Sequence, residues 1–220
     1  MKGVIIILSI EIRKLPPALV QDYARFFDTT PHNKSGNGDK CYCITFCKDG
    51  VYHNGGSHWY SSLEERKLHG IQRVQDGDIQ GYLAYCNGEV VGWCNSNTKA
   101  DCLKCFSWRM MMDSVPTDEL AAGTKVKSVF CFLIASEMRR KGIAKMFLER
   151  VCQDAAQDGF DIVEAYPYKK FKDETKDFLG PVELFIKNGF TVHFETNENL
   201  VMRKKLNTHD LFVHEMQGQK

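Results

Sequence analysis

The 220-residue sequence lacks any long uninterrupted apolar run. A membrane-spanning helix needs roughly 18 or more consecutive apolar residues, and the apolar run at residues 4–8 is shorter than the core of a typical secretory signal. We therefore predict a cytoplasmic protein that has no membrane partner. A strong charge of either sign is also missing, because 29 basic residues offset 28 acidic ones. Nucleic-acid-binding domains usually carry a basic face, so we expect no nucleic-acid partner.

The chain also lacks an even cysteine count, because it contains nine cysteines. An odd count without a secretory signal argues against a complete disulfide framework and predicts reduced thiols. Cys41, Cys43, Cys102 and Cys105 form a C-x-C and a C-x-x-C, and four thiols can close a tetrahedral zinc site. Cysteine is also a common small buried residue. We predict no metal ligands, and a zinc or redox protein built on these loops is an alternative.

The centre of the chain reads as strand, turn, helix and strand. Residues 126–134 are β-branched, aromatic and apolar, which predicts a strand. Residues 142–157 repeat an apolar side chain every fourth position, which predicts an amphipathic helix with one face on a sheet. Asp158-Gly159 ends that helix, and a second strand is predicted at residues 161–165. This order of elements is typical of a crossover unit.

The turn inside this unit has the features of an anion site. Arg139, Arg140 and Lys141 precede Gly142, where the first backbone N–H groups of the helix have no partner within it. Free N–H groups, the helix dipole and nearby cations all favour an anion such as a diphosphate. The alternative is a basic helix start that only contacts water.

The flanking segments predict further elements of one sheet. Two apolar runs within residues 81–94 surround Asn87-Gly88, which is typical of a tight hairpin turn. The other predicted elements are strands at residues 4–12, 190–195 and 200–206, and helices following Pro17, at 62–75 and from Gly180 to Gly189. Residues 29–61 and 95–123 read as variable loops. The second contains aromatic and methionine side chains that fit either a lid over a binding site or a helix packed on the core.

The central stretch resembles the signature of the GCN5-related N-acetyltransferase (GNAT) family. That signature is Gln or Arg, any two residues, Gly, any residue, then Gly or Ala, placed between a long strand and a helix. Arg139, Gly142 and Ala144 match it. The hairpin around Asn87-Gly88 is similar to the one that precedes the cofactor strand in that family. A late family element, a lysine before Gly-Phe at a helix end, is matched by Lys187, Gly189 and Phe190.

The resemblance implies an α/β (α+β) fold, the acyl-CoA N-acyltransferase (GNAT) fold, with a mixed, mostly antiparallel twisted sheet flanked by helices. It implies one domain over residues 1–206, followed by a tail at 207–220. The expected reaction is direct transfer of the acetyl group of acetyl-CoA to an amine, on a small molecule or a peptide, and a homodimer is possible. The residues expected to bind the cofactor are Phe132, Ile134, Arg139, Arg140, Lys141, Gly142, Ile143, Ala144 and Lys145.

The chain departs from the family pattern at the expected acid. Many members have a tyrosine where this chain has Phe185, which has no proton to give, and Phe178 replaces the helix's usual early asparagine. Glu164 and Tyr166 alternate onto one strand face and are the candidates for catalytic base and acid, unless they are simply buried. A relay through Cys131 is also conceivable. A CoA-binding module without catalysis is an alternative function. Lys169, Lys170 and Lys172 either meet the 3′-phosphate of CoA or form a solvated loop.

Overall fold

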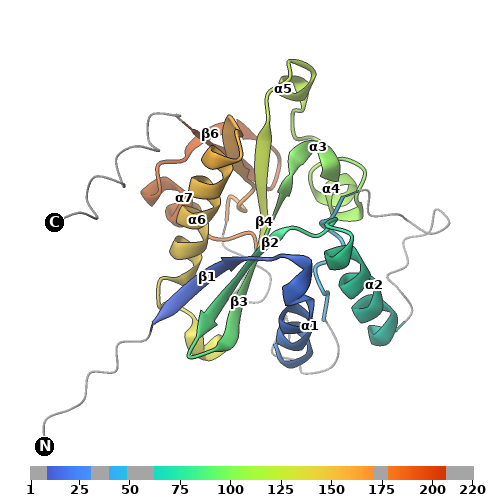
Figure 1. The fold of residues 1–220 in the computed structure, drawn as a ribbon. Helices are drawn as coiled ribbons and strands as arrows, with labels where there is room; N and C mark the ends of the chain where they lie inside the picture. The colour runs from blue at the N-terminus through green and yellow to red at the C-terminus, as the bar shows by residue number, and fades with distance from the viewer. Residues whose placement is uncertain (1–8, 31–39, 49–61, 171–177, 207–220) are drawn as a thin grey trace, which may run out of the picture.

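The computed structural model describes residues 9–30, 40–48, 62–170 and 178–206, whose strands form a single seven-stranded sheet. The strand order is β1-β2-β3-β4-β5-β7-β6 (Figure 1). Every neighbouring pair is antiparallel except β4 and β5. The predicted mixed, mostly antiparallel sheet is therefore confirmed. The strands are β1 Ile10–Lys14, β2 Gly81–Cys86, β3 Glu89–Thr98, β4 Val126–Ile134, β5 Ile162–Ala165, β6 Thr191–Glu195 and β7 Leu200–Lys205.

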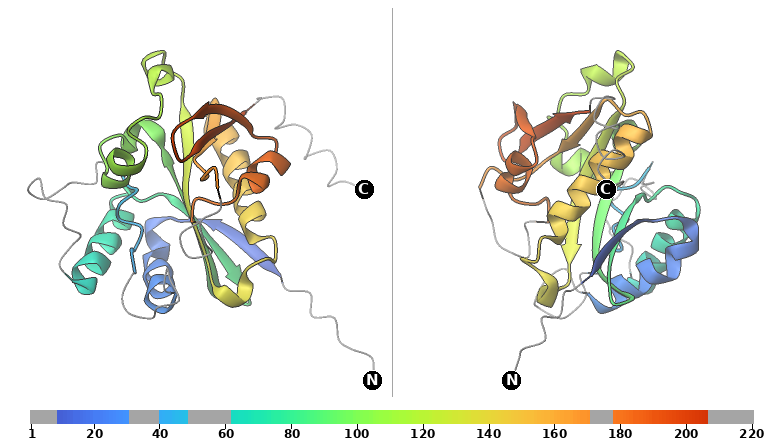
Figure 2. Two further views of the ribbon diagram at one scale, coloured as in Figure 1. Left: turned by 180° about the vertical axis from the view of Figure 1, so that it is seen from behind. Right: turned by 60° about the vertical axis from the view of Figure 1, so that its left-hand side comes forward.

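Helices cover both faces of this sheet, with α6 on one side and α1 and α2 on the other (Figure 1). Three short helices, α3 to α5, lie near the start of β4, and the turn before α6 lies at the opposite end of the molecule (Figures 1 and 2). None of the described helices is long and apolar enough to cross a membrane. The helices are η1 Pro17–Leu19, α1 Val20–Thr29, α2 Leu63–Gln75, α3 Lys99–Cys102, α4 Phe106–Met111, α5 Asp118–Ala121, η3 Ser136–Met138, α6 Ile143–Gln157 and α7 Val182–Lys187.

Alternation along the strands builds a separate apolar cluster on each face. In β2, Tyr82 and Ala84 pack with α6, whereas Leu83 and Tyr85 pack with α1. The α6 stripe predicted from the sequence is buried as expected, because all its residues belong to the cluster on that face. Successive strand residues point to opposite faces, so a strand that is covered on both sides is apolar throughout.

Local sequence signals place the hairpin and α2 where they were predicted. Asn87 and Gly88 have φ angles of 51° and 84°, the left-handed values that a tight hairpin turn requires. The hydroxyl of Ser62 accepts a hydrogen bond from the Glu65 N–H, and the Glu65 carboxylate accepts one from the Ser62 N–H. This capping box satisfies N–H groups that the first turn of a helix leaves unpaired.

Two expectations need correction or completion. The first strand begins at Ile10 and continues to Lys14, beyond the predicted end at residue 12, because β1 pairs with β2 as far as Tyr82. The segment 95–123 is no open loop, since Trp108 and Met112 are buried against Phe130. Of the two alternatives for this segment, a lid over a binding site or a helix packed on the core, the second therefore describes the structure. The predicted strand at residues 4–8, the loops at 31–39 and 49–61, and the tail at 207–220 lie outside the described residues.

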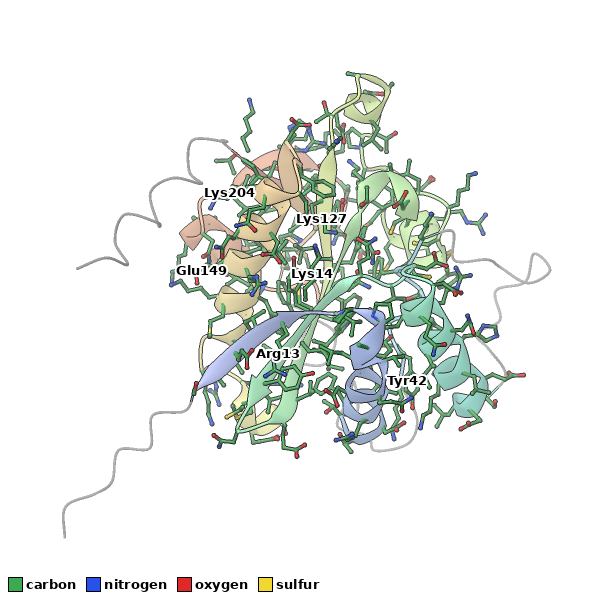
Figure 3. All side chains as sticks on the ribbon, in the orientation of Figure 1. Arg13, Lys14, Tyr42, Lys127, Glu149 and Lys204 are labelled. Atoms are coloured by element: carbon green, nitrogen blue, oxygen red, sulfur yellow. The ribbon has the colours of Figure 1, made fainter. Side chains whose placement is uncertain are left out.

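Lys127 is a buried cation near the start of β4 (Figure 3). Lys127 is only 5% exposed, and its Nζ donates a hydrogen bond to Gln80 Oε1 at 2.8 Å. Burial, followed by the proximity of Lys14, lowers the pKa of Lys127 to about 8. The unfolded chain therefore binds more protons than the folded one between pH 8 and the ordinary lysine pKa of about 10.4.

We expect Lys127→Met to raise the free energy of unfolding at pH 7 by about 1–3 kcal/mol, because it removes a buried charge. The destabilising effect of the charge is fully present below pH 8 and fades as the pH rises towards 10, so the gain should shrink over that range. Urea denaturation at pH 7, 8.5 and 10 measures this trend. The exposed Lys125→Met is the control. A gain that is constant with pH would contradict the assignment.

Candidate active site

The turn between β4 and α6 forms a cradle of backbone N–H groups. Arg140 and Gly142 adopt left-handed φ angles of 61° and 83°, which bends the chain sharply just before the helix. The first hydrogen bond of α6 runs from the Met146 N–H to the Gly142 carbonyl, so the N–H groups of the preceding helical residues point out of the helix end. Such an arrangement of N–H groups is a ready site for an anion.

Cations surround this cradle while apolar side chains anchor it. Arg140, Lys141 and Lys145 are exposed, whereas Met138 and Ile143 are buried in the core. Ile143 therefore offers only its main chain to a ligand. The Nε of Arg139 donates to the Ile134 carbonyl at 3.2 Å, which fixes the turn against the end of β4. Ala144, which was also predicted to bind the cofactor, is half-buried.

The strands β4 and β5 part on the way towards this turn, which leaves a gap between them where they are not paired. The two strands pair only from Val126 to Val129 on β4 and from Ile162 to Ala165 on β5. β4 then continues to Ile134, still paired with β3 on its other edge. The register between β3 and β4 shifts here, so that Phe130 has no partner residue on β3. Phe130 directly follows the last β4 residue that pairs with β5. Beyond it, the edge of β4 that faces away from β3 is no longer paired with β5.

The chain itself contacts this edge at Phe132. The Phe132 N–H donates to the Phe178 carbonyl at 2.7 Å. Gly180 follows with a φ of 83°, and a Cβ placed there would lie 3.1 Å from the Phe132 ring. The backbone turn at Arg139 to Lys145 thus fits a diphosphate, whereas the predicted arm-binding N–H of Phe132 already has a partner within the chain.

Glu164 and Tyr166, the two candidate catalytic residues, lie together on the face of β5 opposite α6. Both are 0% exposed. The Tyr166 hydroxyl donates to Glu164 Oε1 at 2.8 Å and lies 2.6 Å from the Ser128 hydroxyl. Burial and the neighbouring Glu164 carboxylate raise the pKa of Tyr166 well above its ordinary value. Neither side chain is accessible to solvent in this structure.

Two cations neutralise the Glu164 carboxylate. Lys99 Nζ lies 2.8 Å from Glu164 Oε1 and 2.6 Å from Glu119 Oε1. Arg203 contacts both carboxylates and lies opposite Glu164 in the β5–β7 register. Burial by itself raises the pKa of Glu119, but the hydrogen bonds from Lys99 and Arg203 hold it below its ordinary value. This cluster of two cations and two anions joins the segment 95–123 to the sheet.

Comparison with known proteins identifies the family. The model of the acetyltransferase (GNAT) family matches residues 48–172, more than half of the chain. The chain belongs to the GNAT family. It is therefore an acetyltransferase by family, as its signature residues predicted. A search of curated protein sequences found no match.

Solved structures of GNAT proteins share the fold. A GNAT acetyltransferase from Streptococcus pneumoniae superimposes with a TM-score of 0.50 at 14% identity, covering 90% of this chain and 100% of that one. An acetyltransferase from Thermus thermophilus gives 0.50 at 15% identity, covering 91% and 99%. At such identities the similarity shows the fold alone. The PaiA N-acetyltransferase of Thermoplasma acidophilum, solved in complex with coenzyme A, gives 0.47 at 18% identity, covering 90% and 99%.

The residue that departs from the GNAT pattern, Phe185, is fully buried beside the gap. Its ring centroid lies 6.3 Å from that of Phe132 and 5.5 Å from that of Phe190. A phenol at this position would lie near the edge of β4, but the phenyl ring only packs. Lys169, which was considered for the 3′-phosphate, pairs with Glu195 at 2.9 Å. Lys170 is exposed, and Lys172 lies outside the described residues.

The cysteines do not gather into a metal site within the part of the chain that the structure describes. All nine are free thiols. Cys41 and Cys43 belong to the cluster under α1, whereas Cys102 and Cys105 belong to the cluster around Trp108. Cys131 is buried, and its pKa is raised by its hydrogen bond to Cys43 and by burial, which disfavours the thiolate that a relay would need.

Sequence reasoning missed Lys99 and Arg203, and it noted Phe178 only as a departure from the family pattern, not for its carbonyl. Lys99, Arg203 and the Phe178 carbonyl come from segments far from β4 and β5 along the chain. No local pattern marks them. Arg203 is followed by Lys204 and Lys205, so its charge does not stand out within β7.

We expect Glu164→Gln to lower the free energy of unfolding by about 3 kcal/mol, because it leaves Lys99 and Arg203 buried with one anion fewer. Urea denaturation at pH 7 measures the loss. The control is Glu195→Gln, an exposed carboxylate paired with Lys169, whose effect should stay below about 0.5 kcal/mol. A loss under about 1 kcal/mol for Glu164→Gln would show that the cluster adds little to stability.

Proposed function

We propose that this GNAT protein transfers the acetyl group of acetyl-CoA to a primary amine. The observation that carries the proposal is the cradle at Arg139 to Lys145, with its two left-handed residues and exposed cations, next to the edge of β4 that β5 leaves unpaired. Together they offer a diphosphate site and a strand edge for an extended amide-containing arm. Acetyl-CoA has both parts, and its thioester supplies an activated acetyl group.

The binding roles follow from these contacts. The N–H groups from Arg140 to Lys145 and the side chains of Arg140 and Lys141 would hold the diphosphate. Arg139 positions the turn through the Ile134 carbonyl. The main chain of Phe132 and Ile134 would hold the arm, and a β4 N–H there would donate to the thioester oxygen as negative charge develops on it.

Proton transfer accompanies the acetyl transfer. A free amine attacks the acetyl carbon, the bond to sulfur breaks, and the amine must lose a proton while the thiolate gains one. Phe185 cannot donate that proton. Glu164 and Tyr166 remain a prediction for base and acid, but their burial favours a positioning role. We propose that water carries the protons at the open side of the gap.

Acceptor, location and assembly belong to the same proposal. The acceptor is a small-molecule or peptide amine. We place the reaction in the cytoplasm, in keeping with nine free thiols. A homodimer would use the edge strand β6, where Val192 and Phe194 are exposed.

A CoA-binding module without catalysis is the second candidate. It is favoured by Phe185, which lacks the expected proton, and by the Phe132 N–H, which the chain already occupies. The first candidate predicts thiol release from acetyl-CoA in the presence of an amine. The second predicts binding alone.

We expect Gly142→Trp to weaken acetyl-CoA binding by at least about tenfold, because the added ring fills the cradle. Calorimetric titration measures it. Gly123→Trp is a matched control, since Gly123 has a φ of 81° and, like Gly142, open space where a Cβ would stand. Equal losses in both variants would show that strain rather than the site is responsible. Dephospho-CoA in parallel tests whether Lys169 and Lys170 meet the 3′-phosphate.

We expect Tyr166→Phe to change kcat by less than about tenfold, because a general acid normally contributes 100-fold or more and this hydroxyl is bound to Glu164. Thiol release with an amine found by library screening gives kcat across pH 6–10. A drop of 100-fold or more, with loss of the alkaline limb of the pH profile, would instead establish Tyr166 as the acid.

A further inference from the structure

The segment Phe178 to Gly180 lies where the acetyl-CoA arm would bind. The Phe178 carbonyl accepts the Phe132 N–H at 2.7 Å, on the β4 edge that β5 leaves unpaired. A strand edge offers each N–H to one acceptor at a time. The chain and an arm bound along this edge therefore compete for the same hydrogen bond.

Packing on both faces of the sheet holds this segment in place. Leu179 is 1% exposed and packs in the cluster of Phe130 and Tyr166, on the face opposite α6. Gly180 lies against the Phe132 ring, whose side chain belongs to the α6 cluster. Consecutive residues thus contact opposite faces, so the segment passes through the gap between β4 and β5.

Gly180 allows this close passage for two reasons. Its φ of 83° lies in the region that favours glycine, and a Cβ would come within 3.1 Å of the Phe132 ring and 3.4 Å of the Phe185 ring. The buried phenyl ring of Phe185 therefore has a structural role: it forms part of the wall against which the segment packs.

We propose that residues Phe178 to Gly180 are a built-in competitor of the acetyl-CoA arm, so that the arm pairs with β4 only when this segment leaves the Phe132 N–H. The inference rests on the proposed function. In the cradle, Arg140, Lys141, Gly142 and Lys145 are exposed. The diphosphate end can thus bind first, and the arm then displaces the segment. The apparent dissociation constant of the cofactor is its intrinsic value divided by the fraction of molecules in the open state, so a small open fraction weakens binding.

The test compares a ligand that has the arm with one that lacks it. CoA and 3′-phosphoadenosine 5′-diphosphate, which keeps the diphosphate of CoA but has no arm, are titrated into the wild-type protein, Leu179→Ala and Leu179→Val. The second variant covers the case in which the first does not fold. Val115→Ala is the control, because Val115 packs in the same cluster but belongs to the segment 95–123.

We expect Leu179→Ala to bind CoA about tenfold more tightly than the wild type, because weaker packing raises the open fraction. 3′-Phosphoadenosine 5′-diphosphate should bind all variants alike, and Val115→Ala should match the wild type. Without ligand, the Phe132 amide should exchange faster in Leu179→Ala than in the wild type.

Two other results would overturn the proposal in distinguishable ways. If the wild type binds CoA but both Leu179 variants bind it equally or more weakly, the segment is not a competitor of the arm. The proposed function would be unaffected by that result. No CoA binding by any folded variant would remove the proposed function, and the inference with it.

Discussion

The short pairing between β4 and β5 is the constraint on which the site depends. The strands part after Val129 and Ala165, and from there β4 keeps only β3 as a partner. A parallel pair that ends early leaves one edge of a central strand open in the middle of the protein. Backbone groups rarely stay unpaired when buried. The gap must therefore be filled by a ligand, by water or by the chain, and in this structure Phe178 contributes one partner.

Buried charges on the face opposite α6 join β5 to β7 and to the segment 95–123. Glu164 on β5 and Arg203 on β7 lie side by side, and Lys99 and Glu119 bring in the segment 95–123. Buried ion pairs add little net stability compared with apolar packing, but breaking one is strongly destabilising. The cluster therefore fixes where the segment 95–123 lies. The buried Tyr166 hydroxyl lies beside this cluster, bound to Glu164 and Ser128.

Phe185 and Phe178 acquire a common explanation from this packing. Read as single substitutions, each removes a polar group from the family pattern. In the structure, Phe185, Phe132 and Gly180 pack together, and Phe178 supplies the carbonyl that pairs with β4. An apolar wall suits a peptide segment in the gap better than a lone hydroxyl would, because a buried hydroxyl needs its own partner.

The sequence by itself determined most of the elements and the turn at Arg139 to Lys145, because each depends on neighbours a few residues away. The short helices α3, α4 and α5 were not predicted individually. Helical spacing placed α6, Asn87-Gly88 set the hairpin, and Arg139, Gly142 and Ala144 marked the turn. Only the tertiary structure decided the roles of Glu164, Tyr166 and Phe132. Their partners Lys99, Arg203 and Phe178 lie far away in sequence, and burial, ion pairing and competition for one N–H depend on how distant segments meet.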